Sequence, residues 1–243
     1  ITGKSGRAFL AELQKEQSVD RHYTFVARSE ESCSWLRQSL PGCSVVKASL
    51  DDKRLIYKEI VGGGYNTLFH IAGIRYSPDL VKAALDSRTV RRIVLVHTTG
   101  IYSKYKAAGE DYRNIEDDIQ QMLYGKNVSL TILRPTMIYG SLNDHNVSVF
   151  MKMVYKLRLF PLVNGGRYEL QPVWCIDLGK AYYKVLQHPE TTFNRNYVLS
   201  GGEPILLIDM LKVMGAQLNV KNQFFSVPFW LVYSCAYLVY LLT

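Results

Sequence analysis

Short apolar runs alternate with amphipathic stretches along the first two-thirds of the chain. Such runs are typical of strands in a buried parallel sheet, and apolar positions spaced three and four apart predict helices between them. The expected strands cover residues 23–26, 44–47, 67–71, 92–97 and 130–133. The expected helices cover residues 6–17, 32–39, 55–61, 78–87 and 111–123. This order predicts βαβ units, and therefore an α/β fold with a parallel sheet.

The alternation becomes looser after Tyr139 and Gly140. Further along, the pattern predicts a loop at 141–146, an apolar helix at 149–157, a hairpin turn at Gly165 and Gly166, a helix at 177–187, a strand at 196–199 and a helix at 205–214. We therefore divide the chain into a first domain, residues 1–140, and a smaller lobe, residues 141–243, which is interleaved with the first domain.

The composition is that of an ordinary globular protein, with 243 residues, 48% hydrophobic and 21% charged. This excludes a disordered chain, a collagen-like repeat and a coiled coil. The four cysteines are scattered, which indicates reduced thiols of a cytosolic protein and no metal site. Lys and Arg exceed Asp and Glu by 29 to 21, giving a net charge of +8, but they form no basic stripe. The charge therefore favours phosphate-bearing small molecules over nucleic acid.

A glycine-containing turn opens the sequence at Thr2-Gly3-Lys4-Ser5-Gly6. Glycines between a strand and a helix let the backbone approach a pyrophosphate at the N-terminus of that helix. We therefore expect Gly3, Ser5 and Gly6 to contact such a group. The strand that should precede this turn would lie before Ile1, and we expect the chain to be incomplete at both ends.

Four further segments accompany this turn in order along the chain. They are Phe69-His70-Ile71-Ala72-Gly73, Leu133-Arg134-Pro135 leading to Tyr139-Gly140, Pro172-Val173 leading to Asp177-Leu178, and Tyr197 to Glu203. As a set they resemble the NAD(P)-dependent epimerase/dehydratase family, the extended and atypical branch of the short-chain dehydrogenase/reductases. The resemblance covers residues 1 to about 235. It implies a Rossmann-type, doubly wound parallel sheet with a small C-terminal substrate lobe.

The resemblance also implies a nicotinamide cofactor. Ala72 and Gly73 match residues on its adenosine side, and Pro135 and Met137 match the turn beside its nicotinamide. Arg28 follows the expected strand 23–26, at a position where an acid would favour NAD, so NADP is expected, with NAD as the alternative. Ser49 replaces the acid that contacts adenine in the family, and Ser49 and Leu50 are the expected contacts there. Further candidates for pyrophosphate contacts are Lys152, Lys156, Arg158 and Arg167.

The catalytic residues of the family are a Ser or Thr, a Tyr and a Lys. Thr98 matches the hydroxyl position, but the Tyr-x-x-x-Lys pair is displaced. Counting back from Arg134 and Pro135 places the tyrosine position at Ala108 and the lysine position at Tyr112. Counting forward from Thr98 places the tyrosine at Tyr112 and the lysine position at Glu116, whose carboxylate would raise the pKa of that tyrosine. The only literal match is Tyr102 to Lys106, on an expected loop. Our candidates are Thr98 with Tyr112 or Tyr102, while His70 and His97 are expected to pack at strand ends.

Two principal functions follow from these residues. The first is an NAD(P)-dependent oxidoreductase or epimerase/dehydratase that acts on a nucleotide sugar or a similar hydroxyl or carbonyl compound. The second is a catalytically degenerate protein that binds NAD(P) and serves in regulation or redox sensing. We expect a cytoplasmic homodimer. The charge-free segment 224–243 is expected to form an apolar helix, with membrane contact as the alternative.

Overall fold

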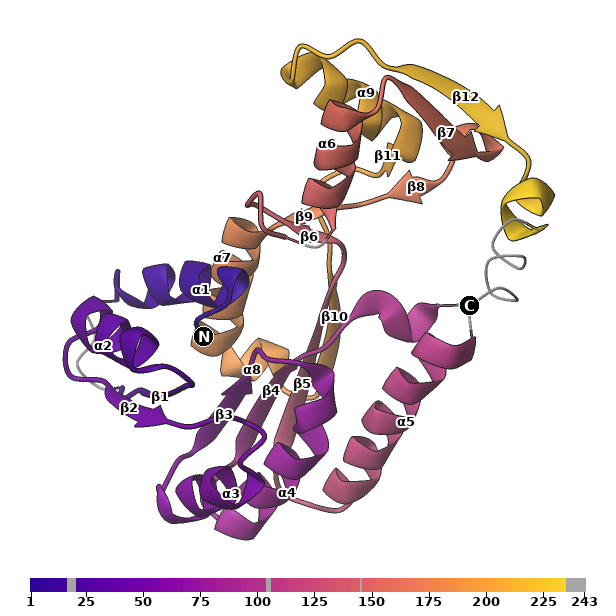
Figure 1. Cartoon of the computed structure of the whole chain (residues 1–243). Helices are drawn as coiled ribbons and strands as arrows, with labels where there is room; N and C mark the ends of the chain where they lie inside the picture. The colour runs from indigo at the N-terminus through magenta and orange to yellow at the C-terminus, as the bar shows by residue number, and fades with distance from the viewer. Residues whose placement is uncertain (17–20, 104–105, 145, 235–243) are drawn as a thin grey trace. The chain divides into compact units, whose positions relative to one another are not determined.

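The computed structural model describes residues 1–16, 21–103, 106–144 and 146–234 (Figure 1). Its contacts divide the chain into two compact units. Unit 1 comprises Ile1–Thr136 and Cys175–Leu199, and unit 2 comprises Met137–Trp174 and the chain from Ser200 onward. The segment 175–199 thus lies in the same unit as the N-terminal part of the chain.

The strands of unit 1 form two parallel sheets. One sheet pairs β1 (Thr24–Ala27) with β2 (Ser44–Lys47). The other has the order β10-β5-β4-β3 and consists of β3 (Thr67–His70), β4 (Arg92–Val96), β5 (Ser129–Pro135) and β10 (Arg195–Leu199). These strands confirm the predicted α/β class and parallel pairing, with ends that differ from the predicted ones by at most two residues.

Helices connect the parallel strands of unit 1, as βαβ units require. They are α1 (Lys4–Leu13), α2 (Glu30–Ser39), α3 (Lys53–Gly62), α4 (Ser77–Ser87), α5 (Lys106–Leu123), α7 (Cys175–Gln187) and the short α8 (Pro189–Thr192). Polar side chains define two of the helix starts: Ser29 accepts a hydrogen bond from the Ser32 amide at 3.2 Å, and Asp52 accepts one from the Leu55 amide at 3.1 Å. The first helix begins and ends earlier than predicted, and α5 begins five residues earlier.

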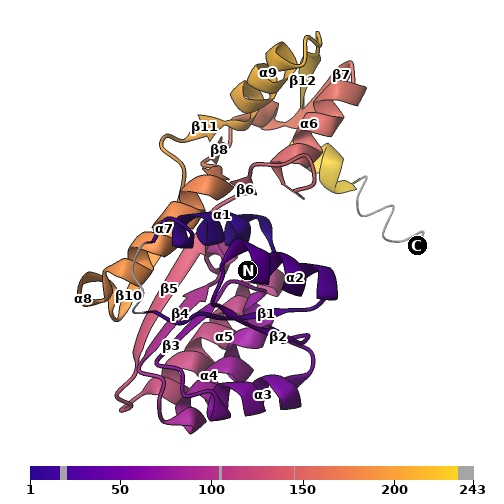
Figure 2. The ribbon, with the colours of Figure 1, turned by 90° about the vertical axis from the view of Figure 1, so that its left-hand side faces the viewer.

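The main core of unit 1 lies between the larger sheet and helices α3, α4 and α5. Its buried side chains include Ile56, Val81, Ile93, Leu95 and Ile119. Helices α1 and α7 lie on the other side of the strands (Figure 2). The sheet region is therefore covered on both faces, as in a doubly wound fold.

Helices α1 and α7 approach each other closely. A Cβ atom added at Gly179 of α7 would lie 2.4 Å from the carbonyl carbon of Ala8 in α1, so only glycine fits there. Beside this contact, the rings of Phe9 and Phe69 lie 4.9 Å apart, and Tyr182 lies 6.0 Å from each of them. These rings join α1, β3 and α7 and hold the N-terminal turn against the sheet.

Unit 2 is built from short strand pairs and helices. The strands β7 (Leu159–Val163) and β12 (Gln223–Val227) pair in parallel, as do β6 (Ile138–Tyr139) and β9 (Val173–Trp174), whereas β8 (Glu169–Leu170) and β11 (Ile205–Leu206) are antiparallel. Helices α6 (Val147–Lys156) and α9 (Leu207–Gln217) contribute to a separate core that contains Val154, Phe160 and Leu211.

One prediction for this part of the chain is wrong, and two hold in part. The residues on either side of Gly165 and Gly166 form no hairpin, because β7 pairs with β12 and β8 pairs with β11. The predicted helix 205–214 begins only at Leu207, since Ile205 and Leu206 belong to β11. Residues 224–227 belong to β12, residues 229–234 are helical as predicted, and the last nine residues of the predicted apolar helix lie outside the described part of the chain. None of the helices in the described ranges has the length and apolar character to cross a membrane.

Replacing Gly179 with Ala tests the contact between α1 and α7. We expect the free energy of unfolding to fall by about 1–3 kcal/mol, because the added methyl group forces the helices apart. Chemical denaturation of the variant measures this loss. The control is Gly62→Ala at the end of α3, where no atom lies within 4 Å of the added carbon and stability should not fall. Equal stability of the two variants would contradict the close contact.

Candidate functional site

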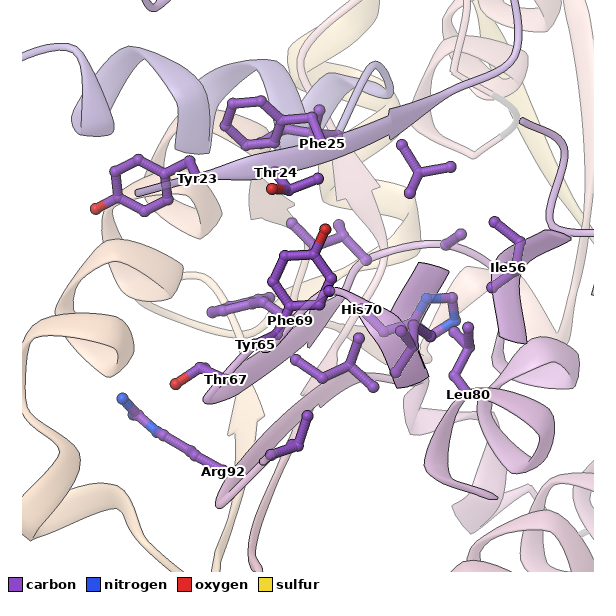
Figure 3. Close-up of a pocket in the computed structure, with 18 of the residues that line it drawn as sticks. Tyr23, Thr24, Phe25, Ile56, Tyr65, Thr67, Phe69, His70, Leu80 and Arg92 are labelled. Carbon is purple, nitrogen blue, oxygen red and sulfur yellow. The ribbon is translucent and has the colours of Figure 1, made fainter. Parts of the chain in front are cut away.

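A cavity of about 1520 Å³ lies within unit 1, and strands β1 and β3 both line it (Figure 3). It reaches the carboxyl ends of these strands, where ligands bind in open α/β sheets. Eight of the ten predicted cofactor residues line it: Gly3, Ser5, Gly6, Arg28, Ser49, Leu50, Ala72 and Gly73. Residues separated by up to seventy positions in the sequence thus meet at one cavity.

The glycine turn forms the N-terminus of α1 at this cavity. Gly3 is the N-cap residue, and its carbonyl accepts a hydrogen bond from the Arg7 amide at 2.8 Å. A Cβ atom at Gly6 would lie 2.3 Å from the carbonyl oxygen of Ile1, so the backbone can turn this tightly only with glycine. No side chain caps the helix, and its first turn contains no acid. The free amides and the helix dipole therefore favour an anion here.

A polar cluster forms around Asp51 on the cavity wall. The Asp51 carboxylate accepts hydrogen bonds from Tyr76 at 2.9 Å and Ser49 at 3.0 Å. These bonds, together with the positive charges of Arg75 and Arg28, hold the pKa of Asp51 below its usual value. The Ser49 hydroxyl is therefore hydrogen-bonded to Asp51, and the charges of the Arg75 and Arg28 guanidinium groups act on the same carboxylate.

Sequence reasoning missed Arg75 and Tyr76. They follow Gly73 in a 3-10 helix, Ile74–Tyr76, and the Arg75 guanidinium lies 4.0 Å from Asp51 and 4.7 Å from the centre of the Tyr76 ring. The sequence did offer a signal for them, since they come directly after Gly73, the last residue of the strand-end segment that resembles the family. Only the fold, however, brings them beside a residue that follows a different strand.

His70, the last residue of β3, faces the same cavity. Its Nε2 donates a hydrogen bond to the carbonyl oxygen of Gly73 at 3.2 Å, which ties the end of the strand to the following turn. Burial lowers the pKa of His70 to about 4. The ring is therefore neutral near pH 7, and it serves to hold the turn in place.

Thr98 and Tyr112 meet at Gly100. The Thr98 hydroxyl accepts a hydrogen bond from the Gly100 amide at 3.0 Å and caps a 3-10 helix, Thr99–Tyr102. A Cβ atom added at Gly100 would lie 2.9 Å from the Tyr112 ring and 3.3 Å from the Thr98 oxygen. The structure thus brings these two candidates together, although neither lines the cavity.

Tyr102, the other tyrosine candidate, ends the same 3-10 helix and is 60% exposed. The Arg134 guanidinium carbon lies 5.9 Å from the centre of its ring. Lys106 is the first residue of α5, so the literal Tyr-x-x-x-Lys match does not lie on a single helix. Residues 104 and 105 of this match are outside the described residues.

A buried network of charged and polar groups lies next to these candidates. The Glu116 carboxylate receives hydrogen bonds from His97 Nδ1 at 2.9 Å and Arg134 Nε at 3.0 Å, and Arg134 Nη2 binds its second oxygen. On the other side of the ring, His97 Nε2 lies 3.0 Å from the Ser77 hydroxyl. Burial raises the pKa of Glu116, but the bonds from His97 and Arg134 outweigh it, so the pKa is lowered and the carboxylate stays ionised.

The order Ser77, His97, Glu116 is that of a nucleophile, a base and an orienting acid. Ser77, however, is 0% exposed, so no substrate reaches its hydroxyl. The Glu116 carboxylate is paired with Arg134 as well as with His97. The network therefore ties α4, β4, α5 and β5 together and does not form a hydrolytic site.

The remaining predicted residues do not line the cavity. Pro135 is buried at the end of β5, where its carbonyl accepts a hydrogen bond from Thr99 at 3.3 Å. Met137 packs against the core of unit 2. Exposed positions in unit 2 are occupied by Lys152, Lys156, Arg158 and Arg167. In the part of the chain that the structure describes, no three His, Cys, Asp or Glu side chains form a group that could hold a metal.

The pH dependence of folding tests the burial of His70. Because its pKa is about 4 in the folded protein and 6.5 ordinarily, the unfolded chain binds the proton first as the pH falls. The stabilisation is complete above pH 6.5 and is lost toward pH 4, with a loss of about 2 kcal/mol between pH 7 and pH 5. Denaturation at the two pH values should show this loss in the wild type and in His22→Gln, an exposed control. If His70→Gln shows the same loss, His70 is not the cause.

Comparison with known proteins gives no matching protein-family model. Among curated proteins, the mitochondrial NADH dehydrogenase (ubiquinone) 1 alpha subcomplex subunit 9 of Arabidopsis thaliana is 24% identical over 99 residues. The match covers 41% of this chain and 24% of that protein. The chain thus spans about a quarter of the length of this curated relative.

Solved structures resemble the chain over most of its length. A UDP-glucose 4-epimerase of Thermotoga maritima has a TM-score of 0.64 at 13% identity and covers 86% of each chain. A dTDP-glucose 4,6-dehydratase of Streptomyces venezuelae, with NAD bound, has a TM-score of 0.69 at 15% identity, over 92% of this chain and 80% of that one. A triphenylmethane reductase of Citrobacter sp., complexed with NADP(H), has a TM-score of 0.70 at 19% identity, over 94% and 77%. The chain therefore has the Rossmann-type fold of the NAD(P)-dependent epimerases, dehydratases and reductases.

Proposed function

We propose that the cavity of unit 1 binds a nicotinamide dinucleotide, with NADP preferred to NAD. The observation that carries this proposal is the convergence of the glycine turn, Arg28, Ser49 and the turn at Ala72 and Gly73 on one cavity at the carboxyl ends of parallel strands. The solved structures with the same fold that contain NAD or NADP(H) support it.

Each part of the dinucleotide has suitable residues in this proposal. The pyrophosphate contacts the uncapped N-terminus of α1 at Gly3, Ser5 and Gly6. Arg28 and Arg75, both near Asp51, provide the positive charge for the 2′-phosphate of NADP. The adenine lies near Leu50, where Ser49 is already bonded to Asp51.

We further propose that the protein is an NAD(P)-dependent oxidoreductase or epimerase/dehydratase. When bound, the nicotinamide exchanges a hydride with a substrate carbon. Thr98 positions the substrate oxygen, and Tyr112 or Tyr102 exchanges the proton. Tyr112 lies beside Thr98 at Gly100, and Tyr102 lies under the positive charge of Arg134. The substrate class we propose is a phosphate-bearing small molecule, such as a nucleotide sugar, in keeping with the +8 charge.

A second candidate is a protein that binds NAD(P) without turnover. It is favoured by the absence of a Tyr-x-x-x-Lys pair on α5 among the described residues. Glu116 occupies one of the two positions where the lysine is expected, and its carboxylate is paired with Arg134. The partial match to an NADH dehydrogenase subunit is compatible with this candidate. Homodimer formation, cytoplasmic location and membrane contact through 224–243 remain predictions.

The contribution of Arg28 can be measured by calorimetric titration with NADP and NAD. Arg28→Ala should weaken NADP binding about 10- to 100-fold and leave NAD binding unchanged, because only NADP carries the 2′-phosphate. Arg37→Ala, which removes an exposed arginine of α2 outside the cavity, should change neither affinity. If the wild type binds neither nucleotide at millimolar concentration, the cofactor proposal is wrong.

Turnover separates the two candidate functions. We would follow both nicotinamide absorbance and sugar product by chromatography, because an epimerase or dehydratase returns the hydride to its product, with a panel of nucleotide sugars for the wild type, Tyr112→Phe, Tyr102→Phe and the double variant. For an enzyme, one tyrosine should reduce kcat about 100-fold without weakening NADP binding. Full activity of the double variant would contradict the proton-transfer assignment. NADP binding without turnover on any sugar would favour the second candidate.

A further inference from the structure

A buried hydroxyl group on α7 has no hydrogen bond of its own. Tyr182 is 0% exposed, and its hydroxyl oxygen makes no hydrogen bond of ordinary geometry with any of the described residues. A polar group that is buried without a partner costs free energy, and most buried hydroxyls in folded proteins are therefore bonded. The Tyr182 hydroxyl thus lowers the stability of the folded chain unless another state of the protein gives it a partner.

The packing of Tyr182 accounts for its ring but not for its hydroxyl. The ring lies edge-on to Phe9 of α1 at 6.0 Å and is tilted against Phe69 of β3 at the same distance. Phe9 and Phe69 also contact each other, so the cluster is otherwise formed by phenylalanines. A phenylalanine at position 182 would keep these ring contacts without the cost of the buried hydroxyl.

The packing of α1 on α7 places Ser5 beside this hydroxyl (Figure 2). Ser5 is followed three residues later by Ala8, which lies under Gly179, and four residues later by Phe9, which contacts the Tyr182 ring. Residues three and four apart share one face of a helix, so Ser5 lies on the face of α1 that α7 covers. Burial raises the pKa of Tyr182 to about 12, and the interaction of its hydroxyl with the Ser5 side chain acts in the opposite direction.

Ser5 connects the buried hydroxyl to the cavity of unit 1. It is half-buried and lines the cavity, whereas Tyr182 lies outside it. Ser5 is also the second residue of α1, a helix whose first turn has no capping side chain. A serine hydroxyl donates one hydrogen bond and accepts others. When the Ser5 hydroxyl donates its proton to an anion in the cavity, its oxygen lone pairs are available to the Tyr182 hydroxyl.

Given the pyrophosphate position of the proposed function, on which this inference rests, we propose that Tyr182 is a positioning residue of the dinucleotide site. Its hydroxyl donates a hydrogen bond to Ser5 Oγ, and the Ser5 hydroxyl donates one to the pyrophosphate. Hydrogen bonds in a chain polarise one another, so the bond from Tyr182 strengthens the bond from Ser5 to the anion. The bound state is then the one in which both hydroxyls have their partners.

Calorimetric titration of Tyr182→Phe with NADP and NAD tests this role. The variant should bind both nucleotides about three- to tenfold more weakly than the wild type, because both contain the pyrophosphate. Without nucleotide, chemical denaturation should show a variant at least as stable as the wild type, since a buried hydroxyl without a hydrogen bond has been removed. The control is Tyr183→Phe, which removes the hydroxyl of the next residue of α7, a half-buried side chain outside the cavity, and should change neither affinity.

The Ser5→Ala background shows whether Tyr182 acts through Ser5. In that background Tyr182→Phe should cause no further loss of affinity, whereas a purely structural role predicts the same loss with and without Ser5. Wild-type affinity in Tyr182→Phe, or an undiminished loss in the Ser5→Ala background, overturns the role of Tyr182 and leaves the proposed function standing, because the wild type still binds. If the wild type binds neither nucleotide, the proposed function is wrong and the role of Tyr182 falls with it.

If Tyr182→Phe does not fold, 3-fluorotyrosine incorporated at position 182 provides a second readout. Its fluorine resonance should shift when the chain is saturated with NADP, because the hydroxyl gains its partner, and this shift should be lost in the Ser5→Ala background. An equal shift with and without Ser5, or no shift in either chain, overturns the proposal.

Discussion

The buried carboxylate of Glu116 is the interaction on which the arrangement of the candidate site depends. It binds His97, which precedes Thr98, and Arg134, which lies over Tyr102. Breaking one partner of a buried charge pair typically costs 3–5 kcal/mol, so this network strongly constrains the ends of β4 and β5. Glu116 therefore holds both the hydroxyl candidate and one tyrosine candidate in position without contacting a substrate itself.

The cavity of unit 1 combines two kinds of surface. At the carboxyl ends of the strands it presents helix amides, arginines and short turns, which suit phosphates. Between β1 and β3 it presents apolar side chains, among them Phe69. The aromatic contacts of Phe9, Phe69 and Tyr182 hold α1 at the boundary between these surfaces.

The sequence predicted much of unit 1, because buried parallel strands and amphipathic helices leave strong local patterns. It predicted less of unit 2, where two-residue strands such as β11 depend on partners far along the chain. The glycine turn and Arg28 were recognisable from local motifs. The bonds of Asp51 to Tyr76 and of Glu116 to Arg134 were not, since each joins residues of different elements that only the fold brings together. Glu116 could be predicted as an obstacle to catalysis, but its pairing could be seen only in the fold.

We propose that a nicotinamide dinucleotide binds at the carboxyl edge of the unit 1 strands. Hydrogen exchange with and without saturating NADPH locates the bound molecule on the chain. Slower exchange is expected in residues 2–9, 26–31, 48–52 and 70–76, with little change in unit 2 segments such as α9. Unchanged exchange in all four segments, or protection confined to unit 2, would contradict it.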